Sequence, residues 1–262
     1  MEYQINDRLS FLRFLGLNIS TEVPDQNTIW LFRETLSRAK AVEKLFRKFD
    51  IYLENHGVIA HKGSIVDASF VEVPRQRNSR EENDQIKKDH IPEEWEDNPN
   101  KLCQKDTDAR WMTKNGKRHY GYKNHIKIDR KSKMIRAYTT TNASVHDSQV
   151  LEYLLEKKDS HHELYADSAY SGEPIKKMLS KKKIRNRIHE KGYRGKPLTE
   201  TQKEKNIKKS KVRARVEHIF GFMKTSMKGS QSRAIGFERN ESIVGLMNLT
   251  YNICRLVQLC RI

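Results

Sequence analysis

Cysteine is scarce in this 262-residue sequence: Cys103, Cys254 and Cys260 are the full set, and no two of them form a CxxC pair. An odd number of distant cysteines predicts neither a disulfide framework nor a zinc site. We therefore expect reduced thiols that are buried in the protein.

Long hydrophobic runs are also missing. No apolar run approaches the roughly 20 residues that a membrane span requires. The first residues, MEYQINDRLSF, contain no apolar core of a signal peptide. We expect a soluble protein that stays inside the cell and has no membrane partner.

Positive charge, in contrast, is abundant. The chain has 51 Lys and Arg against 34 Asp and Glu, a formal net charge of +17, and the excess is concentrated in residues 176–215. Such a tract favours a polyanionic partner, although it could also be a solvated surface that keeps the protein soluble. The hydrophobic share of 36% is enough for a full core.

The spacing of apolar residues in the first half of the chain changes from a helical pattern to a strand pattern, with a charged segment between the first two strands. Residues 1–56 repeat apolar side chains every three or four positions, which predicts a small all-helical module. Three segments then alternate as β-strands do, at 64–73, 119–129 and 133–143. Residues 75–117, between the first two, are rich in charge and poor in aliphatic side chains, so we expect a long, partly disordered loop or insertion there.

The second half alternates helices and strands. We expect a helix at 146–158 with Asp147 as its N-cap, and then a fourth strand from residue 163. A helix at 172–183, a fifth strand near 183–190, a long helix from Thr199 and an apolar helix at 242–259 follow. This order predicts an α/β fold with a mixed sheet, in which the first and fourth strands can be neighbours.

Two acids lie in or just after apolar strands. Asp67 stands in GSIVDASFVEV, and Asp167 follows the strand in LYADSAYSG. If the first and fourth strands are neighbours, these carboxylates meet and need a shared cation, for which Mg²⁺ or Mn²⁺ suits oxygen ligands. Taken singly, Asp67 could instead form a turn at a strand end, and Asp167 could pair with a lysine.

A third acid lies on the long helix. An apolar stripe at spacings of four, three and four residues predicts that this helix packs on the sheet: Val212, Val216, Ile219 and Met223. Beside the stripe, Arg213, Glu217 and Lys224 share one helix edge. An ordinary intrahelical ion pair between Arg213 and Glu217 is the alternative interpretation.

These residues resemble a known family. VDASFVEVPRQRN, YADSAYSG and RARVEHIFGFMK are similar to the three acidic motifs of DDE transposases from bacterial insertion sequences, specifically the insertion-sequence-five branch. The similarity extends to DRLSFLRFLGL, PDQNTIWLFRETL, KDTDARWMTKNGKRHYGYKNH and NASVHDSQVLEYLL. It therefore spans nearly the whole chain.

The resemblance implies a ribonuclease H-like catalytic domain, here residues 57–262, in which Asp67, Asp167 and Glu217 are catalytic and bind two divalent metal ions. The expected reaction is cleavage at the ends of the element, followed by transfer of the 3′-hydroxyls into target DNA. Arg213 and Lys224 match the family signature around Glu217, whereas Ser210 stands where the signature has tyrosine.

The expected partner is double-stranded DNA, both terminal inverted repeats and target. Four basic residues are the candidates for contacting it: Arg213, Lys224, Arg215 and Lys211. We expect a homodimer in the cytoplasm of a prokaryote, associated with the nucleoid when bound to DNA. Trp95 and Trp111 either anchor the insertion to the body or stack on an unpaired base.

The N-terminal module at 1–56 is interpreted either as a DNA-binding helix-turn-helix arrangement or as a dimerisation element. Family members usually carry a further helical stretch ahead of EYQINDRLSF. This favours the hypothesis of an N-terminally truncated chain. The alternative function is then a catalytically idle DNA-binding derivative that inhibits transposition.

Overall fold

A mixed β-sheet forms the centre of the computed structural model, which describes residues 1–114 and 116–260. Within these residues the sheet has six strands: β1 (Ser64–Glu72), β2 (Arg110–Lys114), β3 (Lys117–Asp129), β4 (Ile135–Asn142), β5 (Glu163–Tyr165) and β6 (Arg185–Asn186). The alternating segments of the sequence thus form the predicted strands, while β2 was not predicted.

Strand directions follow from the pairing. β3 runs antiparallel to both β1 and β4, whereas β5 is parallel to β1 and β6 is parallel to β5. The resulting order, β4–β3–β1–β5–β6, is that of a ribonuclease H-like fold, with β2 added beside the first part of β3. The predicted mixed sheet, with its first and fourth strands adjacent, is confirmed.

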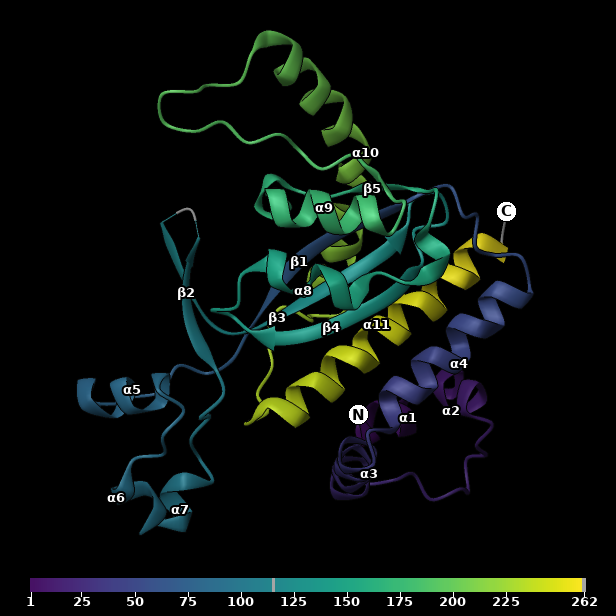
Figure 1. Cartoon of the computed structure of the whole chain (residues 1–262). Coiled ribbons are helices and arrows are strands. Elements are labelled where there is room, and N and C mark those ends of the chain that lie inside the picture. Colours follow the sequence, from purple (N-terminus) through teal and green to yellow (C-terminus); the bar gives the residue numbers. More distant parts are fainter. Residues whose placement is uncertain (115, 261–262) are drawn as a thin grey trace.

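Helices cover both faces of the sheet (Figure 1). On one face lie α10 (Glu200–Thr225) and α11 (Phe237–Cys260), and on the other lie α8 (Asp147–Leu154) and α9 (Glu173–Lys181). Because side chains alternate along a strand, Ile65 of β1 packs into the cluster beneath α10 and α11, and Val66 packs into the cluster beneath α8 and α9.

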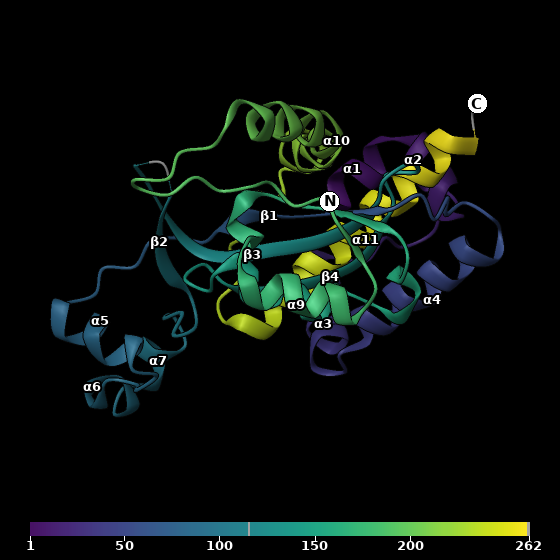
Figure 2. The same ribbon diagram turned by 45° about the horizontal axis from the view of Figure 1, so that its top comes forward.

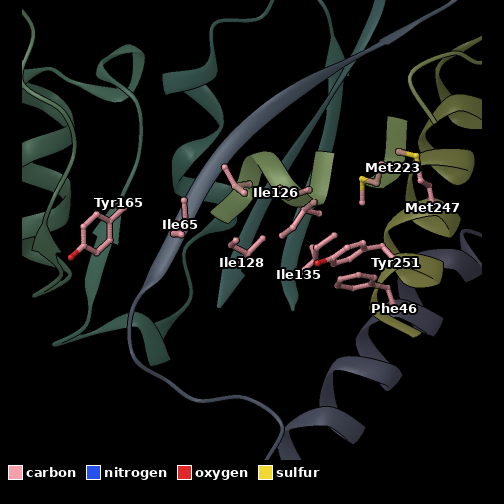
Figure 3. Packing of buried hydrophobic residues seen from close by; sticks show 11 residues of the cluster. Phe46, Ile65, Ile126, Ile128, Ile135, Tyr165, Met223, Met247 and Tyr251 are labelled. Carbon is pink, nitrogen blue, oxygen red and sulfur yellow. The ribbon is translucent and has the colours of Figure 1, made fainter. Parts of the chain in front are cut away.

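A cluster of buried residues holds α10 and α11 against the sheet. It joins isoleucines of β1, β3 and β4 to Met223 of α10 and to Met247 and Tyr251 of α11 (Figure 3). Two buried amides add polar links from α11 to the sheet: Asn248 exchanges hydrogen bonds with Asn124, and the Asn252 side chain bonds the backbone of Ile135. These contacts fix α10 and α11 against the strands.

α11 also corrects an expectation about hydrophobic runs. With 24 residues and a mean hydropathy of 1.2 over its most apolar window, it could cross a membrane by length and composition alone. Its amides Asn248 and Asn252 are 0% and 1% exposed and bond to the sheet. One side of α11 is therefore packed on the sheet.

Four helices precede the sheet, within the segment predicted as helical: α1 (Glu2–Asp7), α2 (Leu9–Leu15), α3 (Gln26–Arg38) and α4 (Ala41–Asn55). The Asp25 carboxylate caps α3 by accepting from the Thr28 amide at 2.7 Å. α4 packs beside α11, and Arg136 of β4 binds its Asp50 at 2.7 Å (Figures 1 and 2). α4 is therefore tied to the sheet.

The described residues of the charged segment, 75–114 and 116–117, contain helices and strand, so the expectation of a loop is wrong for that part. It forms three short helices, α5 (Arg80–Lys87), α6 (Glu93–Glu96) and α7 (Pro99–Leu102), and then β2. Trp95 is fully buried and donates to the Glu82 carboxylate at 2.7 Å. The partners of this ring, Glu82, Lys101 and Lys105, belong to the same segment, so Trp95 organises the lobe from within, whereas the expectation was an anchor to the body.

Two smaller expectations also fail. The N-cap of α8 is His146, because the Asp147 carboxylate instead accepts from the Lys123 ammonium at 2.8 Å. The thiols are free, as expected, but they are not buried: Cys103 and Cys260 are exposed and Cys254 is half-buried. The small number and wide spacing of the cysteines thus did not predict their exposure.

Candidate active site

Asp67 lies in the middle of β1, on the face covered by α10. Its side chain is 14% exposed, and one carboxylate oxygen accepts from the Ala68 amide at 2.9 Å. Burial raises the pKa of Asp67 above its ordinary value, and the adjacent Arg213 guanidinium opposes that rise. A carboxylate in this position needs a cation beside it if it is to stay ionised.

Arg213 of α10 supplies such a cation. Its Nη1 donates to Asp67 Oδ2 at 2.6 Å, and its Nη2 donates to Glu217 Oε1 at 3.2 Å. The predicted intrahelical pair therefore exists, but the same guanidinium also reaches across to the sheet. Two of the three predicted acids, Asp67 and Glu217, therefore bind the same guanidinium.

Asp167 stands two residues after the end of β5. The parallel register pairs Ser64 with Leu164 and Ile65 with Tyr165, so extending it by two residues sets Asp167 beside Asp67. The negative charge of Asp167 contributes to raising the pKa of Asp67, as expected of neighbouring carboxylates. The Asp167 carboxylate also caps the 3₁₀ helix η2 (Ser168–Tyr170) by accepting from the Ser168 amide.

The residues fit a divalent cation in their chemistry. Carboxylate oxygens are the ligands that Mg²⁺ and Mn²⁺ prefer, and Asp67 is a buried anion that requires positive charge. Within the described part of the chain, no three metal-ligating side chains are already assembled into a cage. The Arg213 guanidinium, between Asp67 and Glu217, stands where positive charge is needed.

The remaining predicted DNA-binding residues lie on the accessible sides of α10. Lys211, Arg215 and Lys224 are exposed, and Arg215 Nη1 donates to the Arg130 carbonyl at 2.7 Å. Lys224 lines a cavity of about 150 Å³ together with aromatic rings that include Phe220. Of the four basic residues predicted to bind DNA, Arg213 is the one that contacts the acids.

Three side chains near the acids were missed from the sequence. The Lys114 ammonium, like Arg213, opposes the rise that burial causes in the pKa of Asp67. Burial raises the pKa of Tyr170, and the charges of Asp67 and Asp167 add to that rise. His189, whose pKa is lowered by burial and by Arg213, meets Ser210 Oγ at 3.2 Å. Tyr170 alone had a local signal, since it stands three residues after Asp167.

A groove of about 760 Å³ opens next to Tyr170. It lies between α9, the segment after β6 and the start of α10, and several of its lining residues are basic or aromatic: Lys176, His189, Lys191, Tyr193, Lys196 and Lys209. The acids are therefore flanked by a positively charged depression.

Comparison with known proteins gives two family matches and two structural ones. A family described as the transposase DDE domain matches residues 60–253, and a transposase domain (DUF772) matches residues 1–35. A piggyBac transposase chain from a synaptic complex with hairpin DNA is 13% identical with a TM-score of 0.41. A chain of a pre-cleavage Mos1 transpososome is 11% identical with a TM-score of 0.25.

The two alignments cover unequal shares of the chains. The first covers 98% of this chain and 60% of the piggyBac chain, and the second covers 94% of this chain and 69% of the Mos1 chain. This chain therefore spans less than two thirds of the length of the piggyBac transposase that it matches.

Proposed function

Because the chain belongs to the transposase DDE domain family, we propose that it is a DNA transposase of the insertion-sequence-five branch whose catalytic residues are Asp67, Asp167 and Glu217. The reaction is metal-dependent cleavage at the ends of an insertion sequence. The exposed 3′-hydroxyls are then transferred into target DNA.

The contact of Arg213 with both Asp67 and Glu217, beside Asp167, is the observation that carries this proposal. It joins an acid of β1 to an acid of α10, and Asp167 follows the neighbouring strand β5. Two ions of Mg²⁺ or Mn²⁺ bound by such acids would activate the attacking oxygen and stabilise the leaving one. The three carboxylates would hold these ions, with Asp67 and Asp167 half-buried and Glu217 exposed to the solvent.

Basic side chains around the acids are proposed to bind the DNA. Arg213 and Lys224 contact the backbone near the scissile phosphate, and the exposed Lys211 and Arg215 contact flanking DNA. The net charge of +17 supports this partner, because phosphate neutralisation releases counterions. Binding should therefore weaken steeply as the salt concentration rises.

The assembly is proposed to be a homodimer in the prokaryotic cytoplasm, since two DNA ends must be handled symmetrically. Residues 57–262 form the catalytic domain in this proposal. Residues 1–56 then serve either in DNA binding or in dimerisation.

Nicking of DNA that carries the terminal repeats tests the proposal. With Mg²⁺, wild-type protein should cut, Asp167→Asn should bind without cutting, and the control Asp97→Asn, an exposed residue after α6, should cut normally. If the wild-type protein binds this DNA without cutting it, the proposed enzymatic activity is refuted. That outcome would support the idle inhibitor instead.

A further inference from the structure

β2 and the first part of β3 form a two-stranded ribbon outside the core sheet (Figure 1). Lys114 pairs with Lys117 near the turn, and Arg110 pairs with Gly121 at the base. The register of β1 with β3 begins only at Gly121, and that of β4 begins at Tyr122. Among the described residues, 117–119 are thus paired with β2 alone, while the Tyr120 carbonyl also accepts from the Val73 amide at 3.1 Å. The ribbon, defined here as residues 110–114 and 116–121, projects from the body beyond that bond.

The ribbon is basic along its length. Residues 110–121, RWMTKNGKRHYG, contain four Lys and Arg and no acid, and Lys114, Lys117 and Arg118 are exposed. The lobe of α5–α7 beside it is acidic, because residues 80–97 carry eight acidic and three basic residues. The positive charge is therefore specific to the ribbon and is not a general property of this side of the protein.

Aromatic packing stiffens the ribbon. The ring of Trp111, 44% exposed, lies 5.0 Å from that of Tyr120 and beneath the Arg75 guanidinium at 5.5 Å. On the other face of the ribbon, the His119 ring stacks on Phe70 of β1 at 4.1 Å. A stiff arm loses little conformational entropy when it binds.

The ribbon also lies close to the acids. Phe70, on which His119 stacks, is three residues after Asp67 on β1, about 10 Å along the strand and with its side chain on the opposite face. Lys114 stands over the Phe70 ring at 6.0 Å. DNA bound by the acids would therefore run beside the ribbon.

We propose that this ribbon is a DNA-binding arm that lies in a groove of the double helix next to the scissile phosphate. The major groove is wide enough to admit a two-stranded β-ribbon, and exposed Lys and Arg at its tip are placed to neutralise phosphates. The proposal rests on the proposed function, because it takes DNA as the partner and the three acids as the point of cutting.

The double variant Lys117→Ala/Arg118→Ala tests the arm by the salt dependence of DNA binding. Loss of two phosphate contacts should reduce the slope of log K against log salt by about 2, and weaken binding about 30-fold at roughly 0.15 M salt. The matched control is Lys131→Ala/Lys157→Ala, which removes the same charge from exposed sites. Lys131 follows the opposite end of β3, about 40 Å away at 3.3 Å per residue.

The proposal is supported if the control variant keeps the wild-type salt slope and affinity for DNA while the ribbon variant shows a smaller slope and a weaker affinity. Equal binding by the two double variants would overturn it. The swap Lys117→Arg/Arg118→Lys guards against misfolding, since it keeps the charge and should bind nearly as wild type. Because these readouts are binding constants, failure of the wild type to cut DNA would count against the proposed function and leave the test of the arm intact.

Discussion

Replacing Arg213 by glutamine removes the positive charge that joins Asp67 to Glu217. The Nη1–Oδ2 distance of 2.6 Å sets the two charge centres about 4 Å apart, where the attraction is about 4 kcal/mol at an effective permittivity of about 20. A guanidinium that leaves this position regains hydration. Because the two side chains are 22% and 14% exposed, we take the net value at the low end for a charged hydrogen bond, about 1.5 kcal/mol.

A metal ion that binds these acids has to displace Arg213 from them. We therefore expect Arg213→Gln to bind Mn²⁺ about tenfold more tightly than the wild type in the absence of DNA, since about 1.4 kcal/mol is a factor of ten. Isothermal titration calorimetry with Mn²⁺ measures this directly. The control is Arg215→Gln, which removes one charge from the same helix while its side chain bonds a backbone carbonyl.

Equal Mn²⁺ affinity in Arg213→Gln and Arg215→Gln would refute the reasoning, because a general change of electrostatic field would then explain any gain. Weaker binding by Arg213→Gln would refute it more strongly. It would mean that the guanidinium organises the carboxylates for the metal and does not compete with it.

Two further predictions concern stability. Gly245→Ala in α11 should destabilise the fold by about 2 kcal/mol, because its new Cβ would lie 2.4 Å from the Tyr138 hydroxyl and 2.7 Å from Val42. Gly221→Ala in α10 meets open space and should stabilise the fold by about 0.5–1 kcal/mol. Urea unfolding of both variants measures the two changes. Burial lowers the pKa of His125 from 6.5 to about 4, so the unfolded chain binds this proton first, and unfolding free energy should fall by about 3 kcal/mol between pH 6.5 and 4. His125→Gln should lose that part of the pH dependence, and an unchanged pH profile would contradict the assignment.

The strands and the approach of Asp67 to Asp167 could be predicted because they depend on short-range pattern and on topology. Alternating apolar residues define β1 and β3, and only a few sheet orders accommodate antiparallel strands followed by crossovers. The adjacency of the two acids follows from that order. The strand order alone predicts this adjacency, without any knowledge of side-chain conformations.

Contacts between distant residues could not be predicted. Arg213 meets Asp67 across 146 positions, and nothing in the local spacing of α10 distinguishes that contact from an ordinary pair with Glu217. The lobe of α5–α7 was not predicted for a related reason. Its buried apolar residues are few, chiefly Trp95 and Ile86, so its composition resembles that of a loop. β2 was missed because its short, basic sequence pairs only with the start of β3.

The parallel pairing of β1 with β5 has a consequence for how the protein is made. Asp67 and Asp167 are 100 positions apart, and Glu217 comes 50 positions later. A chain emerging from the ribosome can complete the β1–β3–β4 meander while Glu217 has yet to be synthesised. Under the proposed function, an unfinished polypeptide therefore lacks the third acid of the site until synthesis has passed the middle of α10.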